Sequence, residues 1–390
     1  MDLTPYKECP AHKNSVYIGT DEKCRPCCYY KHYVPITEIT SWDDYQEKIQ
    51  KTDIESGCKH CIDLESNGSK ISHRLQMDPS NDISIAVCPN NVCNLKCTTC
   101  SPEQSSNWIQ DADKMGWLNE DRKKYVLELP HLTNNKLSLC RDIISSADHS
   151  KKIIMTLYGG EPMINPEVIE FVDWLETQPN AKNIHASFIT NGTKIPGKFE
   201  EWIGQFRHSN VVISIDSVRE CNDYLRFGSK WSVIEQNFMK YADIATANGN
   251  FNFGVHMTLS WMNAYYFADF CEWIVSVSPP DKAIGSLHMT KLVGPSYYSL
   301  DNWTPELKQT VFDANVPRVK KLIETTNGFL RQQLEYLLEC YETSLMTYVS
   351  GVAPEKTDCS EGFDILHQLD KLRNSNFDET FSEITKLIKQ

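Results

Sequence analysis

Short apolar runs rich in β-forming residues alternate with helical segments through the middle of the chain. The expected strands are Ile83–Cys88, Ile153–Tyr158, His185–Thr190, Val211–Asp216, Phe251–Ser260 and Ser286–Val293. The expected helices between them include Asn135–Ser146, Pro166–Glu176, Lys198–Phe206, Trp231–Ala247 and Ala264–Val277. This alternation predicts an α/β fold whose parallel strands are joined by right-handed crossovers. In βα barrels the functional site lies at the C-terminal ends of the strands, so residues there are the candidates for function.

A motif of three cysteines follows the first expected strand. Cys93, Cys97 and Cys100 lie in the sequence CNLKCTTC, which is a C-x3-C-x2-C spacing. Thiolates this close in the chain can hold one metal cluster without ligands from distant segments. Four thiolates normally close an iron–sulfur cluster, so a loop with three leaves one iron open to a substrate or cosubstrate. A zinc knuckle or three free thiols is the alternative interpretation.

The motif and the strand before it resemble the signature of the radical S-adenosylmethionine (SAM) superfamily. The resemblance implies that Cys93, Cys97 and Cys100 bind a catalytic 4Fe-4S cluster whose open iron chelates SAM. It also implies that an electron from the cluster splits SAM into methionine and a 5'-deoxyadenosyl radical, which abstracts hydrogen from a substrate. The fold expected from the resemblance is a partial (β/α)6 barrel of the TIM type. The resemblance is strongest over residues 80–295.

Further candidates follow the second, third and fourth expected strands. The sequence GGEP comes directly after the second, and a pair of glycines lets a ligand approach the backbone closely. The resemblance implies that Gly159, Gly160 and Glu161 contact the amino group of SAM, whereas a plain turn is the alternative. Strand-end position and the resemblance together predict cofactor contacts for Asn191, Ser214, Asp216 and Arg226. An arginine suits a carboxylate because its guanidinium offers paired donors, although a solvated helix arginine is the alternative. The glycine and acid pattern of the family is not evident at the fifth strand.

The first 80 residues are rich in cysteine and resemble, more loosely, the twitch extension that carries an auxiliary cluster in some radical SAM enzymes. Two C-x2-C pairs each offer two sulfurs to one metal. The expected ligands are Cys24, Cys27 or Cys28, Cys58 and Cys61. The resemblance favours a second iron–sulfur cluster, and a structural zinc is the alternative because both accept four thiolates. Cys9 and the other member of the Cys27/Cys28 pair remain without an assigned role.

Charge and length restrict the remaining possibilities. The formal net charge of -13 argues against nucleic-acid binding, which depends on Lys and Arg neutralising phosphates. The chain lacks both a run of about 18 apolar residues and an apolar signal core, which predicts a soluble cytoplasmic protein without membrane contact. In such a chain, 15 cysteines favour metal ligation over disulfides. We expect a twitch-like domain over residues 1–80, a radical SAM core over 81–300 and a helical C-terminal extension over 301–390.

Together these features predict a radical SAM enzyme of the oxidoreductase or transferase type. We expect it to modify a peptide or protein oxidatively, with the auxiliary cluster either binding the substrate or accepting an electron. An electron donor such as a flavodoxin or ferredoxin is the expected partner. Modification or dehydrogenation of a small molecule or nucleotide is the alternative reaction. A zinc-binding scaffold without catalysis is the alternative of another class, but it would have no reason to carry GGEP and the polar strand ends.

Overall fold

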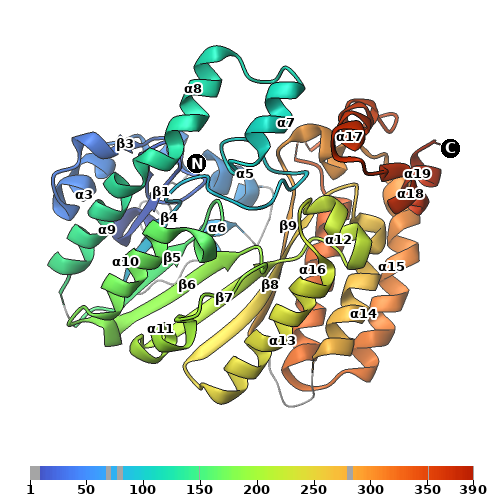
Figure 1. Ribbon diagram of the computed structural model, residues 1–390. Coiled ribbons are helices and arrows are strands. Elements are labelled where there is room, and N and C mark those ends of the chain that lie inside the picture. Colours follow the sequence, from blue (N-terminus) through green and yellow to red (C-terminus); the bar gives the residue numbers. More distant parts are fainter. Residues whose placement is uncertain are drawn as a thin grey trace.

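The fold of this protein is built on one nine-stranded sheet. The computed structural model describes residues 9–66, 72–76, 82–148, 150–278, 284–349 and 351–389. Within these residues the strand order is β3-β2-β1-β4-β5-β6-β7-β8-β9 (Figure 1). The strands are β1 (Ser15–Ile18), β2 (Lys23–Arg25), β3 (Val34–Pro35), β4 (Ile83–Val87), β5 (Ile153–Leu157), β6 (Ile184–Thr190), β7 (His208–Ser214), β8 (Phe251–Leu259) and β9 (Ser286–Lys291).

The six strands from β4 to β9 form a partial barrel. Each pairs in parallel with the next one along the chain, as the strand and helix alternation predicted. In β4 the buried residues Ile83, Ile85 and Val87 alternate with half-buried ones, because successive side chains of a strand point to opposite faces. Over the described residues the two ends of the sheet, β3 and β9, do not pair, so the barrel stays open. The predicted α/β fold with a partial barrel is therefore confirmed.

Helices cover the outer face of this barrel, and a large buried core lies between the helices and the strands. Figure 1 shows α9, α10, α11 and α13 lying along the sheet, with α14, α15 and α16 beyond β9. The helices up to the end of the barrel are α2 (Pro10–Asn14), α3 (Trp42–Gln50), α4 (Ile54–Gly57), α5 (Lys59–Ser66), α6 (His73–Gln76), α7 (Trp108–Lys114), α8 (Glu120–Glu128), α9 (Thr133–Ser146), α10 (Pro166–Glu176), α11 (Phe199–Gln205), α12 (Arg219–Leu225), α13 (Trp231–Ala247) and α14 (Phe267–Val277).

The strands of the N-terminal segment extend the sheet of the barrel. Strand β1 pairs in parallel with β4, with Tyr17 opposite Ala86, and β2 and β3 continue the sheet in antiparallel pairing. The segment thus shares its backbone hydrogen bonds with the core. The twitch-like stretch and the boundary at residue 80 lie partly outside the described residues, and the division into three units stays a prediction.

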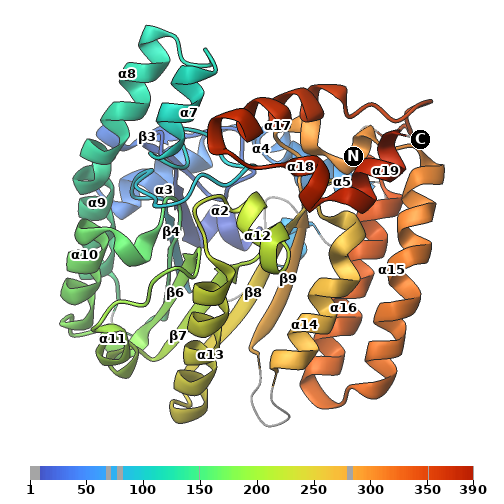
Figure 2. The ribbon, with the colours of Figure 1, turned by 45° about the vertical axis from the view of Figure 1, so that its right-hand side comes forward.

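The C-terminal extension is helical. It comprises α15 (Pro305–Thr325), α16 (Gly328–Met346), α17 (Ser360–Arg373), α18 (Phe377–Thr380) and α19 (Ser382–Lys389). Helices α15 and α16 pack on each other and on α14 and β9. Helix α17 runs above α12, over the end of the barrel that also carries α7 (Figure 2). Among the helices of the described residues, none has the length and apolar character needed to cross a membrane.

Candidate active site

The cysteine loop (residues 93–100) lies after β4 and is tied to the protein through its backbone. The amide of Lys96 donates to the carbonyl of Phe227 at 2.8 Å, and the amide of Thr98 donates to the carbonyl of Leu225 at 2.7 Å. The indole Nε1 of Trp108 donates to the carbonyl of Cys97 at 2.7 Å. Partners after β7 and in α7 therefore fix a loop that contains no regular helix or strand.

The three thiols of the cysteine loop lie close enough to interact. A hydrogen bond with Cys100 lowers the pKa of Cys97 to about 7, whereas burial and the neighbouring Cys97 raise the pKa of Cys93 to about 11. Burial opposes the charge on Arg226, but Cys97 and Asp216 raise the pKa of its guanidinium above the usual value. Iron–sulfur clusters are bound by thiolates. A thiol trio beside a permanent cation therefore suits the predicted 4Fe-4S cluster.

The glycine pair after β5 packs against the segment that follows β4, the first strand of the barrel. Gly159 and Gly160 have φ values of 78° and 53°, a left-handed conformation that favours glycine. A Cβ atom on Gly159 would lie 1.8 Å from the Sγ of Cys88, and one on Gly160 would lie 2.4 Å from the carbonyl oxygen of Val92. The amide of Glu161 donates to that same carbonyl at 2.8 Å. Glycine is required here because the chain packs directly against the residue that precedes Cys93.

Glu161 is a buried carboxylate with three donors. It accepts hydrogen bonds from the amide of Met163 at 3.0 Å, the hydroxyl of Thr190 at 2.6 Å and the amide of Asn191 at 2.5 Å. Burial raises the pKa of Glu161 above its usual range although these donors oppose the shift. The side chain of Asn191 then reaches the cysteine loop, where its Nδ2 lies 2.8 Å from the Oδ1 of Asn94 and 3.8 Å from the Sγ of Cys93. Glu161 thus joins the end of β5 to the end of β6, and Asn191 joins the end of β6 to the cysteine loop.

Asp216 and Arg226 form a buried ion pair after β7. The Nη1 of Arg226 lies 2.9 Å from Oδ2 of Asp216, and Oδ1 of Asp216 accepts from the amide of Thr258 at 2.9 Å. Among the described residues the Nε of Arg226 is buried and has no hydrogen-bond partner. A buried donor without a partner is costly, so this nitrogen is suited to an acceptor on a bound cofactor. Ser214, the half-buried last residue of β7, stands two positions before Asp216.

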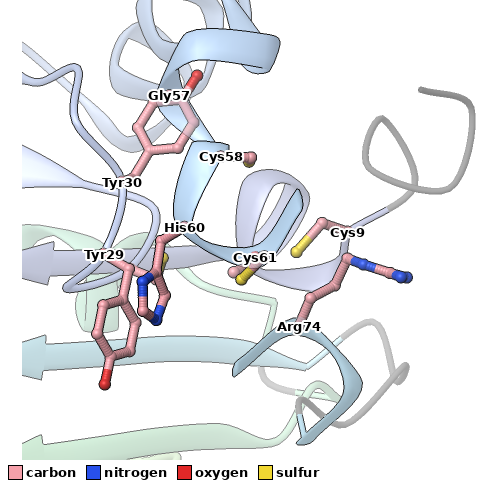
Figure 3. A pocket seen from close by; sticks show the side chains of 10 residues that line it. Cys9, Tyr29, Tyr30, Gly57, Cys58, His60, Cys61 and Arg74 are labelled. Atoms are coloured by element: carbon pink, nitrogen blue, oxygen red, sulfur yellow. The ribbon is translucent and has the colours of Figure 1, made fainter. Parts of the chain in front are cut away.

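A second group of thiols gathers in the N-terminal segment, in what we call the N-terminal cysteine pocket. It is a small cavity into which Cys9, Cys27, Cys58 and Cys61 project. Figure 3 shows Cys9 and Cys61 facing each other across the cavity, with Arg74 beside them and His60 against Tyr29. The rings of His60 and Tyr29 stack with their centroids 4.3 Å apart. Cys27, Cys58 and Cys61 were predicted to share a site, whereas Cys9 had no assigned role.

The other two cysteines of the predicted auxiliary site lie elsewhere. Cys24 is the central residue of β2 and is completely buried in the main core, because the alternation of the strand turns it inward. Cys28 is exposed and does not line the pocket. In the part of the chain that the structure describes, no group of three or more His, Cys, Asp or Glu side chains is set for a single metal ion.

Several residues around the cysteine loop were not predicted. Asn94 and Lys96 lie inside the motif, and Trp108 and Asp111 lie in the helix that follows it. Lys96 forms an ion pair with Asp111 at 2.8 Å. The only sequence signal for these residues was nearness to the motif, because no residue pattern records which of their side chains pair.

The comparisons with known proteins match part of the chain. No family model matches it. The radical SAM cyclopropyl synthase TigE of Paramaledivibacter caminithermalis is 26% identical over 169 residues, which are 43% of this chain and 34% of TigE. The mycofactocin maturase MftC of Mycobacterium tuberculosis is 30% identical over 88 residues, which are 22% of each protein. The chain thus spans 34% and 22% of the lengths of these two relatives.

Solved structures also match with low similarity. The structure of anSMEcpe with bound AdoMet and the Cp18Cys peptide has 20% sequence identity and a TM-score of 0.36, and the match covers 59% of this chain and 58% of that one. This TM-score is too low to indicate a shared fold. The assignment therefore relies on the two sequence relatives and on the motif. Cys93, Cys97 and Cys100 lie in one loop at the end of the first barrel strand, and over part of its length the chain is similar to radical SAM enzymes.

Proposed function

We propose that this protein cleaves SAM reductively at a 4Fe-4S cluster bound by Cys93, Cys97 and Cys100, and abstracts hydrogen from a substrate. The single observation that carries the proposal is the gathering of these three thiols beside the Arg226 guanidinium in one anchored loop. When bound, the cluster and SAM together supply the 5'-deoxyadenosyl radical. The protein's own part is to hold the reactants and keep water away.

The residues around the loop suit distinct parts of SAM. Arg226 carries a buried Nε without a partner in the described chain, and a guanidinium matches a carboxylate group. We assign it to the carboxylate of SAM, with Asp216 orienting it. The backbone of Gly159, Gly160 and Glu161 is assigned to the amino group. Asn191 and Ser214, at the ends of β6 and β7, are assigned to the remaining polar groups of the cofactor.

We also propose a second iron–sulfur cluster in the N-terminal cysteine pocket. Four thiols line this pocket, namely Cys9, Cys27, Cys58 and Cys61, and four thiolates close a cluster. The proposed ligand set therefore takes Cys9 in place of Cys24, which lies in the core. A cluster with four protein ligands has no open iron for substrate, so of the two roles considered, electron acceptor fits better than substrate binding.

An electron acceptor favours an oxidative reaction, and we propose a peptide or protein as the substrate. Support comes from MftC, which is named a maturase. A small electron carrier of the flavodoxin or ferredoxin type would supply the first electron, and the cytoplasmic location stays a prediction.

Anaerobic reconstitution with iron and sulfide tests both clusters. We expect about eight irons per wild-type chain and about four in the Cys93/Cys97/Cys100 triple alanine variant, with 5'-deoxyadenosine formed from SAM and reductant only by the wild type. Cys9→Ser should lower the iron count and leave SAM cleavage measurable, whereas the matched controls Cys24→Ser and Cys28→Ser should keep all of the iron.

The outcomes separate the proposals. Loss of iron in Cys24→Ser but not in Cys9→Ser would contradict the second ligand set. About four irons with one bound zinc would make the N-terminal cysteine pocket structural. A wild type without iron and without SAM cleavage would overturn the proposed reaction.

A further inference from the structure

One arginine of the C-terminal extension contacts residues that hold the cysteine loop. Arg373 is the last residue of α17, and its Nε lies 3.0 Å from Oδ2 of Asp111 in α7. Both side chains are almost completely buried, with exposed fractions of 3% and 4%. Burying an ion pair costs desolvation free energy, and good geometry together with further contacts offsets that cost. Those further contacts lead to the motif.

The carboxylate of Asp111 bridges Arg373 to the motif itself. Its Oδ1 pairs with the Nζ of Lys96 at 2.8 Å, and Lys96 directly precedes Cys97 in the loop. One buried carboxylate therefore holds two cations, one from the loop and one from α17. Loss of Arg373 would leave this carboxylate with the half-buried Lys96 as its one remaining cation among the described residues.

The guanidinium of Arg373 also contacts two aromatic rings. Its central carbon is 4.6 Å from the ring centroid of Trp108 and 4.8 Å from that of Phe227. Both residues help to hold the loop backbone, since Trp108 donates to the carbonyl of Cys97 and the carbonyl of Phe227 accepts from the amide of Lys96. A planar guanidinium can stack on rings and pair with a carboxylate at once, which a lysine ammonium cannot do equally well.

Helix α17 is held in place independently of Arg373. The carboxylate of Asp370 accepts from the hydroxyl of Tyr224 at 2.8 Å and from the amide of Phe377 at 2.8 Å. Tyr224 belongs to α12, directly before the segment that holds the loop. In addition, the helix buries Leu366 and Leu369. The arginine is thus presented by a docked helix and not by a free tail.

We propose that Arg373 is a positioning residue for the cysteine loop, and that the C-terminal extension completes the SAM-cleaving site by holding the loop in its ligating shape through Asp111, Trp108 and Phe227. The inference rests on the proposed function for the cluster, but the contacts that carry it involve only side chains and backbone of this chain. Helix α17 then has a role in metal retention although it supplies no ligand.

The test compares Arg373→Met, Arg373→Lys and the matched control Arg331→Met. Arg331 is an exposed arginine of α16 paired with Glu335, so its loss removes an arginine ion pair far from the motif in sequence. The first readout is amide hydrogen exchange of residues 93–100 in the metal-free protein. We expect exchange at least about fivefold faster in Arg373→Met, the ratio that 1 kcal/mol represents, with Arg373→Lys intermediate and the control unchanged.

The second readout uses the iron-loaded protein. Arg373→Met should release iron to a chelator faster than the wild type and change the electron paramagnetic resonance spectrum of the reduced cluster, and Arg373→Lys should restore part of both. If Arg373→Met does not fold, Tyr224→Phe loosens α17 without emptying the guanidinium site, and it should produce smaller changes of the same sign.

The inference fails if loop exchange and iron release in Arg373→Met stay within twofold of the control, or if Arg373→Lys is no better than Arg373→Met. If the wild type binds no iron, the proposed reaction is overturned. Faster loop exchange in Arg373→Met than in the control would still support the role of Arg373. The two failures are therefore distinguishable.

Discussion

Gly160 packs against the backbone of Val92, the residue before Cys93, and Gly160→Ala should disrupt the proposed SAM-cleaving site. The new Cβ would lie 2.4 Å from the carbonyl oxygen of Val92 and 3.0 Å from its carbonyl carbon. The residue would also have to keep a φ of 53°, which costs a side chain about 1–2 kcal/mol. Moving the Val92 carbonyl away would weaken its bond from the Glu161 amide, a loss of about 1 kcal/mol.

We therefore expect Gly160→Ala to lower the free energy of unfolding by about 2–3 kcal/mol. The displaced carbonyl belongs to the residue before Cys93, so iron binding should fall as well. Urea unfolding of the metal-free protein measures the first effect, and the iron count after reconstitution measures the second.

Gly204→Ala is the matched control for this substitution. Gly204 lies within α11 with nothing inside 4 Å of a built Cβ, and alanine in a helix is more stable than glycine by up to about 1 kcal/mol. The control should be as stable as the wild type or slightly more so, with full iron. If Gly160→Ala stays within about 0.5 kcal/mol of the wild type and binds all of its iron, the steric argument is refuted.

Three further predictions concern buried polar groups away from the thiols. Burial lowers the pKa of Lys308 to about 7, so between that pH and about 10.5 the unfolded chain holds a proton that the folded chain lacks, and stability rises with pH. Lys308→Met should flatten this rise, which is measured as the difference between the urea midpoints at pH 7 and pH 10. If the variant shows the same difference as the wild type, the prediction is wrong. Lys136→Met should lower the free energy of unfolding in urea by about 3 kcal/mol or more. The reason is that the Nζ of Lys136 donates to three backbone carbonyls in and beside the segment leading to the cysteine loop. A change below about 1 kcal/mol would show that water replaces the amine. Tyr341→Phe removes a 2.8 Å hydrogen bond to the carbonyl of Ala264 and should lower the urea midpoint by the equivalent of about 1 kcal/mol. An unchanged midpoint would show that another donor satisfies that carbonyl.

The barrel strands and the three-cysteine motif could be recognised because their signals are local. The strand expected at Ile153–Tyr158 is β5, Ile153–Leu157, since a continuous apolar run between polar segments leaves little choice of conformation. The strand expected at Val211–Asp216 begins three residues earlier, at His208. Residues 208–210 are polar and carry no apolar signal. Pairing with β6 and β8 supplies the hydrogen bonds that extend the strand over them.

The N-terminal cysteines show where local spacing stops being informative. Cys24 and Cys27 form a C-x2-C pair in the sequence, but Cys24 lies in a strand that pairs with β1 and turns its thiol into the core. Cys9 lies before α2, and it reaches the pocket with Cys58 and Cys61 only because the chain folds back on itself. Spacing indicates which thiols could share a metal, and packing decides which ones do face each other.

The sequence by itself indicated the six strands from β4 to β9, the helices that alternate with them and the trio Cys93, Cys97 and Cys100, because each depends on residues that are close together in the chain. Only the tertiary structure decided that β1 joins β4, that Cys9 replaces Cys24 in the N-terminal cysteine pocket and that Arg373 pairs with Asp111, 262 positions away. Such contacts depend on how buried surfaces fit together across the whole chain, and no local pattern of residues records that fit.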